Sequence, residues 1–257
     1  MSERADRTAP RWASRAVQLS FLITLLSLWF WLTTFGHVSP ILLPNPLAVL
    51  HELIQVITTG EFVGDLLTTL SELAVAFTIS MVVGTVIGYL ISRSPYLIEV
   101  FEPLLAGIYS IPIILFLPLY SLLFGLGEAS KIALGATISF FPIVLSTIAG
   151  FSRVEPMMVT AARSMGASDL QLFRFVLLPA AFPVIIAGAR LGFTVALLSI
   201  IGSETLAALH GLGHKIVELS EGMEMPRMFA YIAFVVAIAA ILNLVVSRLE
   251  AWGRRHT

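Results

Sequence analysis

Six apolar runs alternate with shorter polar segments along the chain. They cover residues 17–35, 67–91, 99–124, 130–150, 179–202 and 228–247. A helix needs about 20 apolar residues to cross a bilayer, and each run is close to that length. The pattern therefore predicts an all-α, polytopic membrane protein with six transmembrane helices.

Composition supports the membrane class. Of 257 residues, 58% are hydrophobic and 12% are charged, and the mean hydropathy is +0.95. A soluble domain carries about a quarter charged residues. The net charge of −1 gives no basic surface for nucleic acid, and the absence of cysteine excludes disulfides, thiolate metal sites and cysteine nucleophiles. The first run is long and lacks a small-residue cleavage site, so we expect a retained anchor rather than a signal peptide.

Positively charged residues are distributed unevenly between the two sides. If the N-terminus lies inside, the outer segments hold only Lys131, Lys215 and Arg227. The inner segments hold Arg4, Arg7, Arg11, Arg15, Arg93, Arg153, Arg163, Arg174, Arg248, Arg254 and Arg255. Because Lys and Arg concentrate in cytoplasmic loops, we expect both termini and the 151–178 loop to be cytoplasmic.

One long polar passage, 155–179, separates two strongly apolar runs. Pro156 suits the first turn of a helix, and Gly166 can end that helix in a left-handed conformation. Ser168 and Gln171 then have the spacing of a capping box that starts a second helix. Met158, Ala162 and Met165 recur at helical spacing, while Thr160, Arg163 and Ser164 lie elsewhere on the wheel. The passage therefore predicts two short helices that meet at a glycine, the first of them amphipathic.

Glycine and proline mark three of the apolar runs. Gly84 with Gly88, and Gly188 with Gly192, form GxxxG pairs that let helices approach closely. Pro112 and Pro118 interrupt the third run, where we expect a bend. In the first outer segment, 36–66, the turn Leu43-Pro44-Asn45-Pro46 precedes a short interfacial helix.

Three ionisable residues fall within or beside the spans. Arg190 is about 11 residues beyond Pro179, near the expected middle of the bilayer. It either lines a solute pathway or forms a structural ion pair, with Glu72 as a possible partner. Glu204, at the outer end of the fifth span, is either a polar contact near a gate or an interfacial residue.

Neither metal binding nor ATP binding is expected of this chain. His210 and His214 have helical i, i+4 spacing, but glycines between them interrupt the helix and no third ligand is evident. No phosphate-binding Gly-x-x-x-x-Gly-Lys-[Ser/Thr] loop occurs, and there is no soluble domain to capture a solute. The sequence therefore predicts a permease whose energy comes from another subunit, and not an enzyme.

The polar passage also resembles a known family. Ala161-Ala162, three residues, Gly166, nine residues and Val176-x-Leu178-Pro179 match the signature loop of binding-protein-dependent ABC importer permeases, type I. Thr160 stands where that family usually has Glu. The Pro112–Lys131 segment and Gly211-Leu212-Gly213 are similar to the nitrate/sulfonate/taurine/bicarbonate permeases in particular.

The resemblance implies a set of partners and a division of the chain. It implies a type I permease fold in a bacterial inner membrane, with two permease copies, two ATPase subunits that bind ATP and Mg, and a periplasmic or lipid-anchored solute-binding protein. The expected parts are an N-terminal segment 1–59, a core 60–250 and a cytoplasmic tail 251–257. The resemblance assigns ATPase coupling to the 151–178 loop, in particular to Thr160, Ala161, Ala162, Arg163, Gly166, Ala167, Leu178 and Pro179.

The resemblance leaves the solute open, with a small anion expected first and a thiamine-precursor pyrimidine second. An ion-coupled secondary transporter is the alternative class, although it would predict inverted repeats and intramembrane acids. An intramembrane serine protease that uses Ser203 and His214 has no supporting motif.

Overall fold

The computed structural model describes residues 11–36 and 38–253, and every regular element in this part of the chain is a helix. Arg4, Arg7, Arg254 and Arg255, which contribute to the predicted orientation, lie outside it. The described elements confirm the predicted all-α fold.

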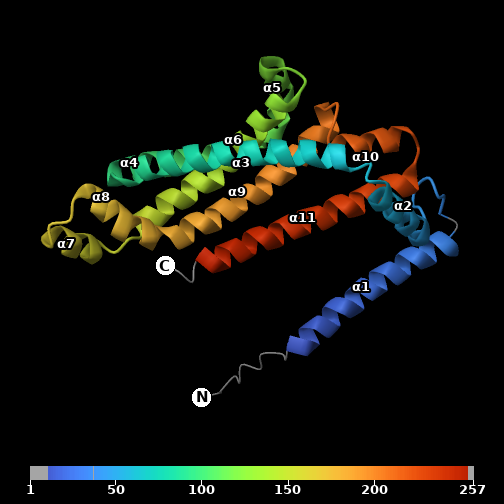
Figure 1. The fold of residues 1–257 in the computed structure, drawn as a ribbon, viewed down its shortest axis with the longest axis horizontal. Coiled ribbons are helices and arrows are strands. Elements are labelled where there is room, and N and C mark those ends of the chain that lie inside the picture. Colours follow the sequence, from blue (N-terminus) through green and yellow to red (C-terminus); the bar gives the residue numbers. More distant parts are fainter. Residues whose placement is uncertain (1–10, 37, 254–257) are drawn as a thin grey trace.

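Four long helices run side by side and form the body of the molecule (Figure 1). Their bounds are Val63–Ser92 (α3), Glu128–Ser152 (α6), Leu178–Ala207 (α9) and Met225–Gly253 (α11). Helix α6 packs along both α3 and α9 and has more buried residues than either of them.

The predicted GxxxG pairs are the places where these helices meet. A Cβ at Gly88 would lie 2.6 Å from Thr147 Cβ, and one at Gly192 would lie 2.7 Å from Ile143 Cγ1. Gly188 leaves similarly little room beside Ser146. Both glycine pairs therefore face α6, and the absence of their side chains permits the close packing.

The third predicted span is not one straight helix. It consists of Pro95–Tyr109 (α4), a 3-10 turn at Ile113–Phe116 (η1) and Leu117–Phe124 (α5), with a bend of 72° between the two parts. The prediction of a single span is correct only if this bent pair counts as one. By length and composition the described residues hold five helices that could cross a membrane, or six with the bent pair.

Of Pro112 and Pro118, the two prolines expected to bend the third run, only the first causes the bend. The helical ladder stops before Pro112, which has no N–H to donate. Pro118 instead falls in the first turn of α5, where a missing N–H costs little. As a result, α5 projects away from the bundle (Figure 1).

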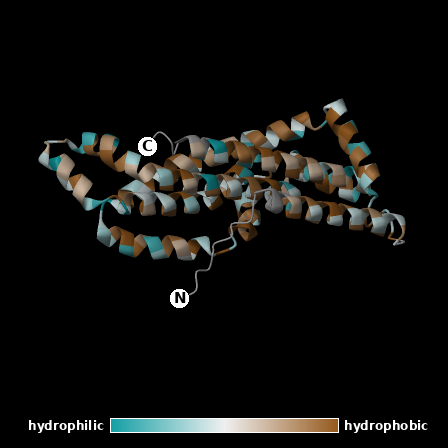
Figure 2. Ribbon diagram, turned by 90° about the horizontal axis from the view of Figure 1, so that it is seen from below, coloured by the Kyte–Doolittle hydropathy of each residue, from teal (hydrophilic) through white to brown (hydrophobic). Residues whose placement is uncertain are grey.

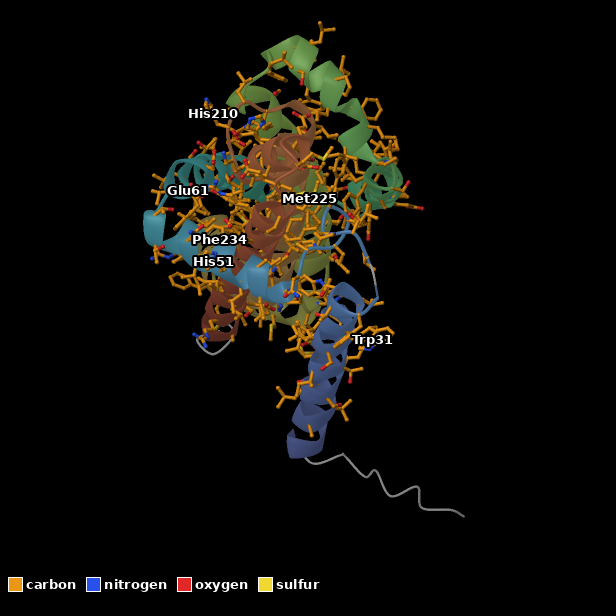
Figure 3. The ribbon with its side chains drawn as sticks, turned by 90° about the vertical axis from the view of Figure 1, so that its right-hand side faces the viewer. Trp31, His51, Glu61, His210, Met225 and Phe234 are labelled. Atoms are coloured by element: carbon orange, nitrogen blue, oxygen red, sulfur yellow. The ribbon has the colours of Figure 1, made fainter. Side chains whose placement is uncertain are left out.

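The N-terminal helices lie at one side of the bundle. Helix α1 (Arg11–Thr34) stands apart from the long helices and leads to α2 (Pro46–Thr59), which confirms the short helix predicted after the Leu43–Pro46 turn. The indole N–H of Trp29 donates to the Pro44 carbonyl at 3.1 Å and ties the two together. Figure 3 shows Trp31 on α1, away from the bundle that contains Phe234.

Apolar side chains cover much of the outer surface. The hydropathy colouring of Figure 2 shows hydrophobic residues along the long helices, and exposed examples are Val82 (58%), Val236 (62%) and Leu244 (58%). Large exposed apolar faces are unfavourable in water but suit contact with lipid or with another membrane helix.

Candidate functional site

The predicted elbow lies at one end of the bundle. Helix α7 (Pro156–Ser164) ends at Gly166, whose φ of +79° is left-handed as predicted. The N–H of Gly166 donates to the Arg163 carbonyl at 3.0 Å, and that of Ala167 donates to the Ala162 carbonyl at 3.1 Å. This pair of bonds is a Schellman motif, so the backbone itself fixes the turn.

The second half of the elbow starts immediately. The Ser168 side chain accepts from the Gln171 N–H at 3.4 Å, and the Gln171 side chain accepts from the Ser168 N–H at 2.9 Å. This confirms the predicted capping box, which opens α8 (Asp169–Leu172). Two motifs with only a few residues between them therefore set the angle between α7 and α8.

The sequence predicts that the polar passage ends at Leu178-Pro179, but the helix is continuous there. Helix α8 continues through a π-helical turn, Phe173–Leu177 (η2), directly into α9. Since Pro179 has no N–H, the Phe175 carbonyl loses its usual partner four residues on. A wider turn before the proline is a common response to such a gap.

The apolar stripe on α7 is mostly uncovered. Ala162 is buried at 5% exposure, but Met158 (52%) and Met165 (82%) are not, and neither is Met157 (73%). Thr160, Ala161 and Arg163 are also exposed. The stripe lines a recess of about 400 Å³ between α7 and the start of α9, whose wall includes Phe175 and Pro179.

The hydroxyls of α7 are satisfied locally. Thr160 Oγ1 donates to the Pro156 carbonyl, and Ser164 Oγ donates to the Thr160 carbonyl, both at 2.9 Å. Thr160 thus bonds to its own helix within this chain. The exposed surface of α7 consists mainly of methionine side chains, alanine and the Arg163 guanidinium.

Glu204 belongs to a second constellation, around the start of α10 (Leu212–Glu221). Its two carboxylate oxygens accept from Thr69 Oγ1 at 2.6 Å and from the Gly213 N–H at 2.8 Å. Thr69 in turn accepts from the Leu212 N–H at 3.0 Å, and Asp65 accepts from the Gly211 N–H at 3.0 Å. Three successive backbone donors of α10 are thereby bound by side chains of α3 and α9.

Glu204 is a polar contact between helices. Its side chain is 1% exposed and anchors the start of the α10 segment. Gly211, with a φ of +113°, and Gly213 let the backbone pass directly against the Glu204 side chain. Helix N-termini favour such carboxylates, because the unpaired N–H groups carry partial positive charge.

Glu72 does not pair with Arg190, so that prediction is wrong. Glu72 is fully buried and forms an ion pair with Lys131, which is itself only 2% exposed. Lys131 is expected in an outer segment, but α6 begins at Glu128 and carries Lys131 into the bundle. The sequence contains a signal for buried polar contacts on α3, because Asp65, Thr69 and Glu72 share one face of an apolar helix.

Arg190 pairs instead with the end of α11. Its guanidinium lies 3.1 Å from a Glu250 carboxylate oxygen, and its side chain is 47% exposed. A second polar contact, from Thr194 Oγ1 to Asn243 Oδ1 at 3.2 Å, joins the same two helices. Arg190 is therefore both a link between α9 and α11 and an accessible cation.

The bend in the third run creates two apolar recesses. One, of about 330 Å³, lies between Tyr109, Pro112 and Ser199, and another, of about 560 Å³, lies beside Pro118 and Leu206. The Ser199 hydroxyl is buried and, in the described part of the chain, has no hydrogen-bond partner. These recesses lie where α4, α5 and α9 leave an uncovered face.

Comparison with known proteins identifies the family. Residues 80–255 match the model of the binding-protein-dependent transport system inner membrane component. The chain is 33% identical to the taurine transport system permease protein TauC of Escherichia coli (strain K12), over 96% of this chain and 92% of that protein. It is 28% identical to the putative aliphatic sulfonates transport permease protein SsuC of Bacillus subtilis (strain 168), over 88% and 82%.

A solved structure shows the same fold. The MetNI methionine ABC transporter in an inward-facing conformation matches with a TM-score of 0.65 at 19% identity, over 74% of this chain and 94% of that one. The predicted type I permease fold and the similarity to the nitrate/sulfonate/taurine group are thus confirmed. The chain belongs to the binding-protein-dependent inner membrane component family and is the multi-pass permease subunit of an ABC importer.

Proposed function

We propose that this permease carries a small organic anion or zwitterion into the cell, with a sulfonate such as taurine as the first choice. The similarity to TauC over nearly the whole of both chains supports this choice, and the similarity to SsuC supports the wider sulfonate class. Arg190, half exposed on α9, provides positive charge for an anion.

The α7–Gly166–α8 elbow is the proposed contact with the ATPase subunit, and its geometry is the observation that carries this proposal. It presents Met157 and Met165 at 73% and 82% exposure on a short helix whose turn is fixed by backbone bonds. Exposed methionines on a rigid helix suit a groove in another protein. Movement of that groove would be passed through η2 directly into α9.

We further propose two identical permease copies, two ATPase subunits and one solute-binding protein per transporter. The uncovered face around α4, α5 and α9, with its two apolar recesses, is the proposed contact between copies and the wall of the solute pathway. With both termini in the cytoplasm, α10 and α2 face outward, where a periplasmic or lipid-anchored binding protein would dock. ATP and Mg would be bound by the ATPase, and none by the 60–250 core.

The test is solute-dependent ATP hydrolysis by the reconstituted transporter. The permease, ATPase and binding protein are placed in proteoliposomes and supplied with taurine, alkanesulfonates, nitrate, bicarbonate or a thiamine-precursor pyrimidine. We expect the sulfonates to stimulate hydrolysis and uptake together. Stimulation by the pyrimidine alone would refute the anion, whereas uptake that follows an ion gradient without ATP would refute the ABC mechanism.

Crosslinking tests the proposed elbow contact separately. Ala162 is one of the expected coupling residues, but its side chain is buried and cannot carry a crosslinker. Thr160→Cys places a reactive group on the exposed surface of α7 instead. We expect it to capture the ATPase subunit, while a cysteine at Glu221, at the other end of the molecule, should not.

A further inference from the structure

A polar recess of about 230 Å³ lies where the elbow meets the ends of α3 and α6. Figure 1 shows α7 and α8 beyond the end of the long helices, and the recess is at this junction. Arg93, from the end of α3, and Arg163, from α7, line it together with Asp169 at the start of α8. Its volume is several times the roughly 30 Å³ that one water occupies in the liquid.

The three charges of this recess are not neutralised by one another. Among the described residues, neither arginine nor Asp169 forms an ion pair, although all three face the same space. Two guanidinium groups and one carboxylate therefore leave room for a partner that carries both signs of charge. The net charge of these three groups is +1, so an anion is attracted and a simple cation is repelled. A zwitterion has in addition a positive group to pair with Asp169, which inorganic phosphate lacks.

The base of the recess is firmly packed. Tyr89 lines the recess and packs edge-to-face against two other rings. Its ring centroid lies 5.0 Å from that of Phe151 and 4.8 Å from that of Phe173. These rings join α3, α6 and η2, so the framework around the charges is set by buried aromatic contacts. The recess is thus a formed feature of the fold with unpaired charges at its opening.

We propose that this recess binds a small zwitterion, with its anionic head between Arg93 and Arg163 and its ammonium group at Asp169. Guanidinium groups bind sulfonate or carboxylate oxygens through paired N–H donors, and a carboxylate accepts from an ammonium. The bound molecule bridges α3 to α7 and α8. Amino sulfonates and short amino acids have this chemistry, and only the choice of taurine as a probe rests on the proposed function.

The test measures equilibrium binding to the permease–ATPase complex in phospholipid nanodiscs, without the solute-binding protein. The probes are taurine, its carboxylate analogue β-alanine, and two single-charge analogues, ethanesulfonate and ethylamine. We expect taurine or β-alanine to bind at least tenfold more tightly than either single-charge analogue. Binding of β-alanine but not taurine would support the site while arguing against the sulfonate as solute.

Three variants locate the binding. Arg93→Gln should weaken zwitterion binding at least tenfold, and Asp169→Asn should remove the preference for zwitterion over ethanesulfonate. Arg153→Gln changes an exposed arginine outside the recess and should leave binding as it is. Equal binding by wild type and Arg93→Gln, or no binding by wild type, would overturn the proposal.

A second outcome would also overturn it. If Arg93→Gln and Asp169→Asn lower the amount of ATPase subunit that copurifies, and no zwitterion binds, then the recess holds side chains of the ATPase. Solute-stimulated ATP hydrolysis by the Arg93→Gln transporter separates this inference from the proposed function. Hydrolysis that persists without zwitterion binding retains the function and rejects the site.

Discussion

At the scale of single residues, the buried ion pair between Glu72 and Lys131 bears directly on stability. Both side chains are at most 2% exposed, and they join α3 to α6. A charge in such a place depends on its partner, because water cannot replace it. Glu204 adds a second buried carboxylate nearby, held by Thr69 and the start of α10.

We predict that Lys131→Met destabilises the protein by about 3–5 kcal/mol, because it leaves the Glu72 carboxylate buried without a cation. The double variant Glu72→Met/Lys131→Met should recover most of that loss. Thermal unfolding of the wild type, of Lys131→Met, of Glu72→Met and of the double variant, each purified in detergent, gives the complete double-mutant cycle. A double variant no more stable than Lys131→Met would contradict the assigned pair.

The Glu72–Lys131 pair also shows which contacts cannot be predicted from the sequence. The spans, the Gly166 elbow and the Ser168 capping box could be predicted because each depends on neighbours within a few positions. The partner of Glu72 could not, because it depends on how α3 and α6 align along their lengths. The same holds for Arg190, whose partner Glu250 is 60 positions away.

At the scale of elements, the elbow depends on one left-handed residue. A Cβ at Gly166 would meet no atom within 4 Å, so a larger side chain is opposed by the backbone conformation alone. For an L-residue the left-handed region costs about 1–2 kcal/mol, and more for a β-branched one. Substitutions at Gly166 therefore test the backbone conformation of the elbow without adding a steric clash between side chains.

We predict that Gly166→Val leaves membrane insertion intact but lowers ATP-driven uptake by about tenfold, the equivalent of about 1.4 kcal/mol. Gly166→Asn is the matched control, because asparagine tolerates the left-handed region, and it should retain most uptake. Normal uptake by the valine variant would show that the elbow does not need this turn.

Helix packing gives a second prediction at this scale. Gly188→Ala places a methyl group against Ser146 of α6 and should cost about 1–3 kcal/mol in thermal unfolding. Adding Ser146→Gly should restore part of the loss by removing the opposing atoms. Gly107→Ala, where the new Cβ has open space, is the control and should be neutral or mildly stabilising.

At the scale of the whole molecule, the elbow and α10 lie toward opposite ends of the bundle (Figure 1). The sequence predicts this separation, because one expected membrane span, 179–202, lies between the 151–178 loop and the 205–227 segment. The bent third run was harder to predict in full. Pro112 and Pro118 are alike in sequence, and only the break before Pro112 tells which of them redirects the chain.

The proposed orientation can be tested directly, because the chain has no cysteine and any introduced thiol is unique. Ser164→Cys on α7 and Glu221→Cys on α10 are both exposed positions. In intact cells or right-side-out vesicles, a membrane-impermeant maleimide should label the second variant and reach the first only after permeabilisation. The reverse pattern would place the elbow outside and exclude contact with a cytoplasmic ATPase.

The π-helical turn at Phe173–Leu177 determines how this segment can tolerate the loss of a residue. A π-helical turn accommodates one residue more than an α-helical one. Deleting a single residue there would let the segment relax into a regular helix, with α9 left in register. Because the wider turn absorbs the extra residue, α8 and α9 would both keep their orientation around the helix axis, whereas a deletion within a regular helix would rotate everything before it by about 100°. The segment Phe173–Leu177 can thus lose one residue without changing the direction in which the elbow faces, and a change that re-aims the elbow requires a deletion in one of the regular helices beside it.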